Sequence, residues 1–141
     1  MNRSYAQLCP IARTLDLIGD RWTLLIVRDL FFGSTKFKEF IEHSPGMPTK
    51  ILADRLKSLE AHGLVQRSVY SEHPLRAEYH LTDAGRSLEP VLAAIAGWGM
   101  EHAVTPAERR AIEPLIRERT GRRTSGTRAL PGTAARRSAR T

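Results

Sequence analysis

The chain has 141 residues, of which 41% are hydrophobic and 26% are charged, which suits one globular domain with a modest core. The sequence has no run of about 18 apolar residues, so it excludes a helix that spans a membrane. Its formal net charge of +7 suggests a polyanionic partner, provided that the positive charges belong to the folded part.

The positive charge is concentrated at the C-terminal end. From Arg119 onward the sequence has seven Arg residues and neither Asp nor Glu, whereas residues 1–118 hold 15 basic and 15 acidic residues. Gly, Ser, Thr, Ala and Arg dominate residues 120–141, and we expect a basic disordered tail there. The tail could be a non-specific DNA-binding arm or a solvated segment without function, and the composition leaves both open.

The single cysteine, Cys9, cannot form a disulfide within the chain, which is typical of proteins in a reducing compartment. The N-terminal sequence MNRSYAQLCPIARTL lacks the uninterrupted apolar segment of a secretory signal peptide. We therefore expect a cytoplasmic protein.

Two helices are predicted in the first quarter of the chain. Pro10 suits the first position of a helix, and Gly19 and Asp20 interrupt its apolar stripe. Residues 22–32 are apolar on nearly every side, which predicts a central buried helix that ends at Gly33.

A short helix and a longer amphipathic helix follow. Ser34 is expected to cap the short helix, with three apolar side chains facing inward: Phe37, Phe40 and Ile41. Breaker residues at 44–48 predict a turn. The helix after it carries its apolar stripe on Leu52, Leu56 and Leu59. Gly63 suits the positive φ that often ends a helix.

The pattern then changes to that of strands. Residues 64–70 and 77–81 are rich in β-forming types, and the five-residue link 71–75, ahead of Arg76, predicts a hairpin with a polar tip. A long apolar helix is expected from Thr82-Asp83, in which Pro90 either causes a kink or marks the true first turn.

A last helix is predicted near the C-terminus. Thr105, Pro106 and Glu108 match a capping box with Pro at the first helical position, so a helix should run to about Arg119. We therefore expect three segments: a winged-helix DNA-binding domain with dimerisation helices at 1–104, an additional helix at 105–119, and the tail at 120–141.

A short helix, a breaker turn, an amphipathic helix and a hairpin, in this order, are typical of a winged helix-turn-helix. The predicted fold is therefore mainly α with a small β wing. In such proteins the second helix lies in the major groove of DNA, with its N-terminal residues nearest the bases, and the wing reaches the backbone or the minor groove.

The amphipathic helix presents a polar face that suits DNA. Its front end is small and basic, so a duplex could approach it closely, and its first turn attracts phosphate through free N–H groups and the helix dipole. Lysines of the preceding helix and side chains of the wing would contact phosphates. The candidate DNA-binding residues are Lys36, Lys38, Thr49, Lys50, Ala53, Asp54, Lys57, Arg67, His73 and Arg76. The alternative for each of them is an ordinary solvated position.

Arg55 falls within the apolar arc of the same helix, so it is expected either to extend its charged end to solvent or to pair with an acid, rather than to contact a base.

Several segments together resemble one family. CPIARTLDLIGDRWTLLIVRDL, KFKEF, KILADRLKSLEAHGLV, RAEYHLTDAGRSL and PVL, between Cys9 and Trp98, are similar to the HxlR-type bacterial winged-helix transcriptional regulators. The resemblance implies that the chain binds operator DNA as a homodimer. It further implies pairing through the N-terminal and C-terminal helices, here residues 10–19 and 83–102. The tail beyond Gly121 is outside the resemblance.

Cys9 is a possible sensor. At the start of the first helix, with Arg13 one turn later, the helix dipole and the guanidinium would both favour the reactive thiolate. A lone Cys is more often inert packing. The family resemblance implies sensing of oxidants or electrophiles at this position, so both interpretations stay open. Oxidation of one Cys can give only an intersubunit disulfide or an adduct with a small thiol.

The face formed by Leu88, Leu92, Ile95 and Trp98 is more apolar than one small domain needs to bury. It is interpreted as a subunit interface, with the core of the monomer as the alternative. Trp22 and Trp98 occur at helical spacing with other apolar residues, which favours packing over ligand stacking.

Catalysis is not expected. Residues 33–36, Gly-Ser-Thr-Lys, lack the G-x-x-x-x-G-K-[ST] spacing of a phosphate loop. The five His residues have no HExxH or other metal spacing, and one Cys cannot anchor a structural zinc. We therefore expect no enzyme activity, no metal and no cofactor. Two alternatives remain: a winged-helix module that binds proteins, and a non-specific DNA-binding protein that relies on the Arg-rich tail.

Overall fold

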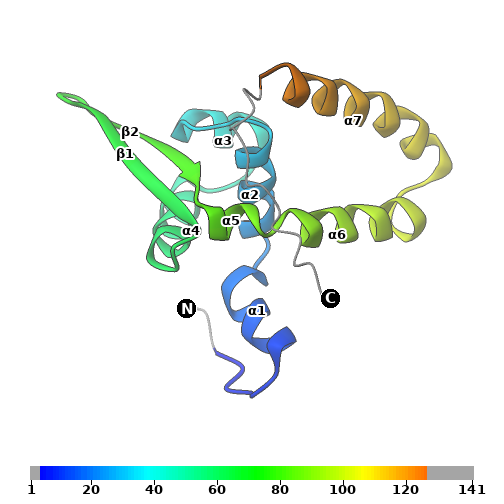
Figure 1. The fold of residues 1–141 in the computed structure, drawn as a ribbon, viewed down its shortest axis with the longest axis horizontal. Coiled ribbons are helices and arrows are strands. Elements are labelled where there is room, and N and C mark those ends of the chain that lie inside the picture. Colours follow the sequence, from blue (N-terminus) through cyan, green and yellow to red (C-terminus); the bar gives the residue numbers. More distant parts are fainter. Residues whose placement is uncertain (1–3, 127–141) are drawn as a thin grey trace, which may run out of the picture. The chain divides into compact units, whose positions relative to one another are not determined.

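A computed structural model of the chain describes residues 4–126, with side chains described up to residue 118. The elements are α1 (Pro10–Ile18), α2 (Thr23–Phe31), α3 (Phe37–His43), α4 (Thr49–Ala61), β1 (Val65–Glu72), β2 (Leu75–Leu81), α5 (Asp83–Arg86), α6 (Glu89–His102) and α7 (Pro106–Gly126), as Figure 1 shows. These helices and the two-stranded antiparallel sheet confirm the predicted fold class, mainly α with a small β wing. The chain divides into two compact units after Val104.

Helix α2 forms the centre of the first unit. Ile26 and Val27 are fully buried, and α2 packs against α3 and β2. Each such side chain stabilises the fold by about 1.5–3 kcal/mol relative to full exposure. Helix α4 packs in turn on α3 and β1. The predicted stripe of α4 lies in this core as expected: Leu52, Leu56 and Leu59.

The turn between α1 and α2 is held by Asp20. Gly19 ends α1, as predicted, and its N–H donates to the Leu15 carbonyl at 2.8 Å. The Asp20 carboxylate then accepts hydrogen bonds from the backbone N–H of Trp22 at 2.9 Å and of Thr23 at 3.1 Å, and from the Thr23 hydroxyl. Because these donors lie at the N-cap residue and the first residue of α2, Asp20 satisfies groups that the helix cannot pair internally.

Ser34 does not cap α3, so that prediction was wrong. It is buried, its hydroxyl lies 3.0 Å from Nδ1 of His43, and α3 begins three residues later. The intervening backbone pairs with the wing instead. The Thr35 carbonyl accepts a hydrogen bond from the N–H of Tyr79 at 2.8 Å, and the backbone of Lys36 forms an antiparallel β-bridge with that of Glu78. This long-range pairing extends the chain and delays the start of the helix.

The wing is longer than its sequence suggested. The strands pair from Val65 with Leu81 to Glu72 with Leu75, so the tip is the two-residue segment His73-Pro74 rather than a five-residue link. The register shifts between Val69 and Ser71. Such a bulge takes up one extra residue and lets the pairing continue toward the tip.

One continuous helix from Asp83 was also a wrong prediction. Thr82 caps the short helix α5 by accepting from the N–H of Gly85 at 3.1 Å, and α6 begins only at Glu89. Pro90 lies in the first turn of α6, which was the second of the two expectations. A proline has no N–H and its ring clashes with the carbonyl four residues earlier, so the helix has to restart.

The second unit begins with the predicted capping box. The Thr105 hydroxyl oxygen accepts from the N–H of Glu108 at 3.2 Å, and the hydroxyl donates to the Glu108 carboxylate at 3.0 Å. Helix α7 then runs to Gly126, past the expected end at about Arg119, with Pro114 inside it. The rest of the predicted tail, 127–141, lies outside the described residues.

Helices α1 and α6 leave apolar side chains at the surface. Ile11 is 71% exposed, and Ile95 and Trp98 are 50% and 64% exposed. Leu88 and Leu92 instead pack against the core. The apolar face predicted on this segment is therefore divided: its first part belongs to the core of the monomer, and the rest is exposed.

We predict that Gly85→Ala destabilises the first unit. A Cβ at this position would lie far inside contact distance of the Leu64 carbonyl oxygen, and 3.0 Å from a methyl of Leu81. Overpacking of this kind costs about 1–3 kcal/mol, which urea unfolding of the purified variant would measure.

The matched control is Gly97→Ala in α6, where a Cβ meets nothing within 4 Å. It should be neutral or stabilise by up to about 1 kcal/mol, because Ala loses less backbone entropy than Gly in a helix. Equal stability of the two variants would contradict the close approach at Gly85.

Candidate nucleic-acid interface

The first turn of α4 is open to a ligand. Pro48 precedes the helix and no side chain caps it, so the first backbone N–H groups are not used by a capping group. Thr49 and Lys50 are exposed at this end. Unused N–H groups, the positive end of the helix dipole and one lysine together favour an anion such as a phosphate.

The remaining polar face of α4 continues this surface. Ala53, Asp54 and Lys57 are exposed on the side opposite the buried leucines. The structure thus brings five predicted residues together on one helix: Thr49, Lys50, Ala53, Asp54 and Lys57. The small Ala53 between two lysines allows close approach of a groove, because a methyl group is the only side-chain bulk at the centre of the face.

Helix α4 is held by an ion pair to the turn before α2. The Nε of Arg55 lies 3.5 Å from the Asp20 carboxylate, and both side chains are mostly buried. Burial raises the pKa of Asp20, but hydrogen bonds from Thr23 and Trp22 and the charge of Arg55 outweigh it, so the pKa lies below the ordinary value of 3.8. Arg55 therefore pairs with an acid, which was one of the two expectations.

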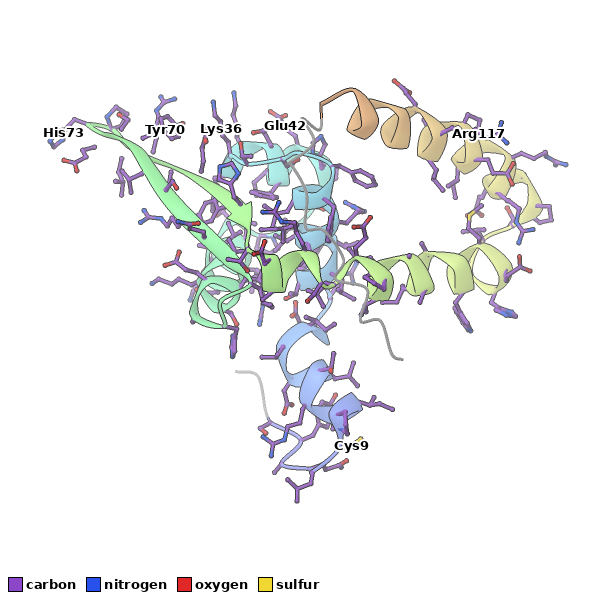
Figure 2. The ribbon with its side chains drawn as sticks, viewed as in Figure 1. Cys9, Lys36, Glu42, Tyr70, His73 and Arg117 are labelled. Carbon is purple, nitrogen blue, oxygen red and sulfur yellow. The ribbon has the colours of Figure 1, made fainter. Side chains whose placement is uncertain are left out.

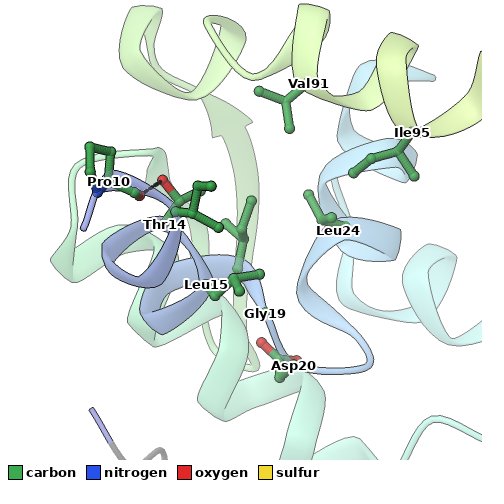
Figure 3. A pocket seen from close by; sticks show the side chains of 10 residues that line it. Pro10, Thr14, Leu15, Gly19, Asp20, Leu24, Val91 and Ile95 are labelled. Carbon is green, nitrogen blue, oxygen red and sulfur yellow. Dashed lines mark hydrogen bonds between the residues drawn. The ribbon is translucent and has the colours of Figure 1, made fainter. Parts of the chain in front are cut away.

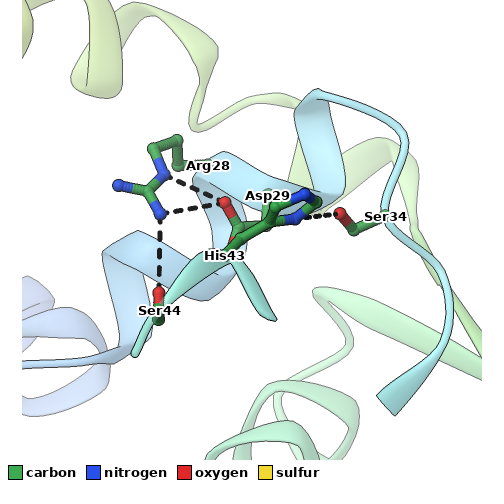
Figure 4. Close-up of polar contacts among 5 residues, drawn as sticks. All are labelled: Arg28, Asp29, Ser34, His43 and Ser44. Carbon is green, nitrogen blue, oxygen red and sulfur yellow. Dashed lines mark hydrogen bonds and ion pairs between the residues drawn. The ribbon is translucent and has the colours of Figure 1, made fainter. Parts of the chain in front are cut away.

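A second group of polar contacts holds α3 in place. Arg28 of α2 bonds to the buried Asp29 at 3.0 Å and reaches the Ser44 hydroxyl at 3.5 Å, at the end of α3 (Figure 4). Ser34, ahead of α3, contacts His43 in its last turn. These contacts tie both ends of α3 to neighbouring segments: Arg28 of α2 at Ser44, and Ser34 at His43.

Lys36 and Tyr70 form a contact that the sequence did not reveal. The Lys36 ammonium lies 5.5 Å from the ring centroid of Tyr70, a cation–π distance, and both side chains lie beside the wing in Figure 2. Tyr70 sits at the bulge of β1 and is 49% exposed. Lys38, the second residue of α3, is exposed.

The wing carries the remaining candidates. Arg67, His73 and Arg76 are all exposed, with His73 at the tip (Figure 2). Arg67 pairs with Tyr79 across the hairpin, so these two side chains project from the same face. Arg76 lies three residues before Tyr79 on β2, and successive side chains alternate between faces. The two arginines therefore project from opposite faces of the hairpin. Both could contact a duplex only if the wing approached it edge-on.

These basic side chains are available to a partner. Among residues 4–118, whose side chains the structure describes, no hydrogen bond or ion pair engages Lys38, Lys50, Lys57, Arg67 or Arg76. A partner therefore does not have to break an internal contact to bind them.

Cys9 precedes α1 directly, as predicted. Its side chain is half-buried and makes no capping hydrogen bond (Figure 2). The Nε of Arg13 donates to the carbonyl of Gln7 at 2.9 Å. The guanidinium is thus oriented by the backbone ahead of Cys9.

Other kinds of site receive no support from the described residues. Within residues 4–126 no three His, Cys, Asp or Glu side chains gather as they would around a metal ion. The helices of this part of the chain are all too short or too polar to cross a bilayer.

The comparisons with known proteins agree with this geometry. The HxlR-like helix-turn-helix family matches residues 17–106. The HTH-type transcriptional regulator YvaP of Bacillus subtilis is 41% identical over 102 residues, which cover 72% of this chain and 93% of YvaP.

Solved structures of regulators are similar as well. The redox regulator HypR in its reduced form is 36% identical, with a TM-score of 0.63 over 67% of this chain and 94% of HypR. The transcriptional regulator YodB from B. subtilis in its reduced form is 36% identical, with a TM-score of 0.57 over 68% of this chain and 95% of YodB.

The element order, the wing and the exposed face of α4 define a winged helix-turn-helix protein. The chain belongs to the HxlR-like helix-turn-helix family, whose matched relatives are transcriptional regulators.

We predict that Asp20→Asn removes a pH-dependent part of the stability. The pKa of Asp20 is lower in the folded chain than its ordinary 3.8, so its contribution is present above about pH 4 and is lost as the pH falls through the folded pKa. Urea unfolding between about pH 6 and pH 2.5 should show wild type and variant converging at the acid end.

Asp83→Asn is the control, since Asp83 is an exposed carboxylate with one long contact to Arg86 at 3.9 Å. A difference between Asp20→Asn and wild type that stays constant with pH would contradict the role of the Asp20 charge.

Proposed function

We propose that this chain is a transcriptional regulator that binds operator DNA through α4, as a homodimer. The observation that carries the proposal is the uncapped first turn of α4, with exposed Thr49 and Lys50. A helix that only packed would gain from a side-chain cap at this end, because its free N–H groups are otherwise left to water. A phosphate or a base edge would use them.

The residues divide into two roles. Thr49, Lys50, Ala53, Asp54 and Lys57 would face base edges in the major groove and supply sequence specificity. Phosphates would be contacted by the surrounding basic and polar groups: Lys36, Lys38, Arg67, His73 and Arg76. Because Tyr70 holds the Lys36 ammonium beside the wing, this lysine would reach a phosphate between α3 and the wing rather than one beside α4.

The homodimer is supported by the apolar surface of α1 and α6. Ile11, Leu15, Ile95 and Trp98 are each more than a third exposed, which a lone monomer in water does not favour. A second copy that covered these helices would give the assembly two α4 helices related by a two-fold axis. Such a dimer reads two half-sites related by a two-fold axis.

Sensing through Cys9 is a further part of the proposal. Cys9 directly precedes the first residue of α1, one of the two helices of the proposed dimer surface. A covalent change of its thiol would therefore alter the pairing of the subunits. HypR is a redox regulator, and its structure has been solved in reduced and oxidised forms. Inert packing of Cys9 is the competing interpretation.

Selection of full-length protein on random duplex DNA, followed by sequencing, tests the function. An inverted repeat with half-sites about one helical turn apart would support a dimeric sequence reader. Enrichment of no sequence, despite binding, would instead support the alternative of a non-specific protein that relies on its Arg-rich C-terminal residues.

We predict that Lys50→Ala and Arg76→Ala weaken DNA binding in different ways. Lys50→Ala should cost about 1–3 kcal/mol at the selected site and relax specificity at one base pair. Arg76→Ala should weaken binding to all sequences alike and reduce the slope of log K against log salt by about 0.9. Fluorescence anisotropy over a range of salt concentrations measures both.

Arg86→Ala removes the same charge from α5, at the end of the hairpin far from its tip, and should change neither quantity. An unchanged slope in Arg76→Ala would show that the wing does not contact the duplex.

We predict that Cys9→Ser abolishes any response to oxidant. Diamide, by accepting two hydrogen atoms, would join the Cys9 thiols of two subunits in a disulfide, seen as a dimer on a non-reducing gel. DNA affinity of the wild type should change by about 5- to 150-fold, the range of ordinary allosteric couplings, and return with reductant. If oxidised wild type bound DNA as the reduced form does, Cys9 would be only a packing residue.

A further inference from the structure

A pocket of about 480 Å³ opens between α1, α2 and α6 of the first unit. In Figure 3, Val91 and Ile95 project from α6 toward α1, and Leu15 and Leu24 lie across from them. This volume is in the range of sites for small molecules, about 300–1,000 Å³. Its walls are mostly apolar, so a ligand with an apolar body would be favoured there.

The polar groups of the pocket are few and carry one sign of charge. Thr14 and Asp20 are among its lining residues. The Thr14 hydroxyl donates to the carbonyl of Pro10 at 2.7 Å, so toward a ligand it can only accept. Asp20 is ionised at neutral pH, because its pKa is below the ordinary value. The pocket therefore offers acceptors and a negative charge.

Asp20 keeps capacity for another donor. A carboxylate has about four acceptor positions, and Asp20 uses three of them for Trp22, the Thr23 amide and the Thr23 hydroxyl. Arg55 lies 3.5 Å away, but its buried Nε makes no hydrogen bond to any described residue. Trp22 and the Thr23 amide both donate to Oδ1, which is also the oxygen that Arg55 approaches, so the position that remains is on Oδ2, where the Thr23 hydroxyl is the one described donor.

We propose that this pocket binds a small apolar cation, an aryl- or alkylammonium compound, with its ammonium group at Asp20 and its apolar body against Leu15, Leu24, Val91 and Ile95. An ammonium group fits because it supplies both the charge and the hydrogen bond that Asp20 can still accept. An anion of the same shape would meet the Asp20 charge at short range and lose the benefit of the apolar walls.

Binding there would act on α4, an inference that rests on the proposed function. Arg55 belongs to α4 and is held by the same carboxylate that would receive the ammonium group. A bound cation competes with Arg55 for Asp20 and weakens this tie between α4 and the turn before α2. Because coupling is reciprocal, the ligand should lower DNA affinity by the same factor by which DNA lowers ligand affinity.

The test compares two probes of similar shape on the full-length protein without DNA. Calorimetry at neutral pH would measure binding of 2-phenylethylammonium and of 3-phenylpropionate. We expect the ammonium compound to bind at least about tenfold more tightly, since a charge pair inside a protein surface is worth more than one factor of ten. Equal binding of the two probes, or binding of neither because a second copy fills the pocket, would overturn the proposal.

Variants assign the effect to the named residues. Asp20→Asn should remove the preference for the ammonium probe, whereas Asp83→Asn, at an exposed carboxylate of α5, should keep it. Arg55→Gln removes the competing charge without changing the pocket lining, so it should raise the affinity for the ammonium probe several-fold. A fall in affinity in Arg55→Gln would contradict competition at Asp20.

The coupling is measured separately, by anisotropy on selected DNA with and without the ammonium probe. Weaker DNA binding by wild type and no change in Asp20→Asn would support the coupling. An unchanged DNA affinity would overturn the action on α4. Since the calorimetry uses no DNA, its result does not depend on the proposed DNA binding.

Discussion

The burial of α2 is the constraint on which the other elements depend. Its core side chains are fully buried, and polar groups at both of its ends hold the helices that could meet DNA. At its start, Asp20 satisfies the first turn of α2 and pairs with Arg55 of α4. At its end, Arg28 pairs with Asp29 and reaches Ser44, directly after α3. Helix α4 is thus tied directly to the start of α2 by one ion pair, and the residue that follows α3 is tied to the end of α2 by Arg28.

An element of this fold could be predicted where the local sequence determines its structure, and it was missed where pairing with a distant segment does. The stripe of Leu52, Leu56 and Leu59 was found because helical periodicity and burial agree. Ser34 was misassigned because its backbone neighbours pair with β2, more than forty residues later, and the sequence near Ser34 has no sign of this pairing. The length of the wing was missed for a similar reason, since a bulge follows from pairing and not from composition.

The candidate interface shows the same limit. The sequence could identify which lysines and arginines would be exposed, because charged side chains rarely lie in a core. It could not show that Arg67 and Arg76 project from opposite faces of the hairpin, which follows from the register of the strands. Nor could it show that Tyr70 holds Lys36, because the cation–π contact joins the start of α3 to the bulge of β1. In each case the missing information is the placement of one element against another.

The proposed dimer surface and the proposed ligand pocket share α1 and α6, so they cannot act independently. Leu15 and Ile95 are exposed in the monomer and also line the pocket. A second copy that covered the mouth of the pocket without filling it would remove water from around Asp20. The cost of burying the Asp20 charge would rise as the local dielectric fell, and a bound ammonium group would offset part of that cost beside Arg55. Association of two subunits should therefore strengthen ligand binding, and the ligand should in turn strengthen association. Both would reach α4 through the ion pair between Asp20 and Arg55.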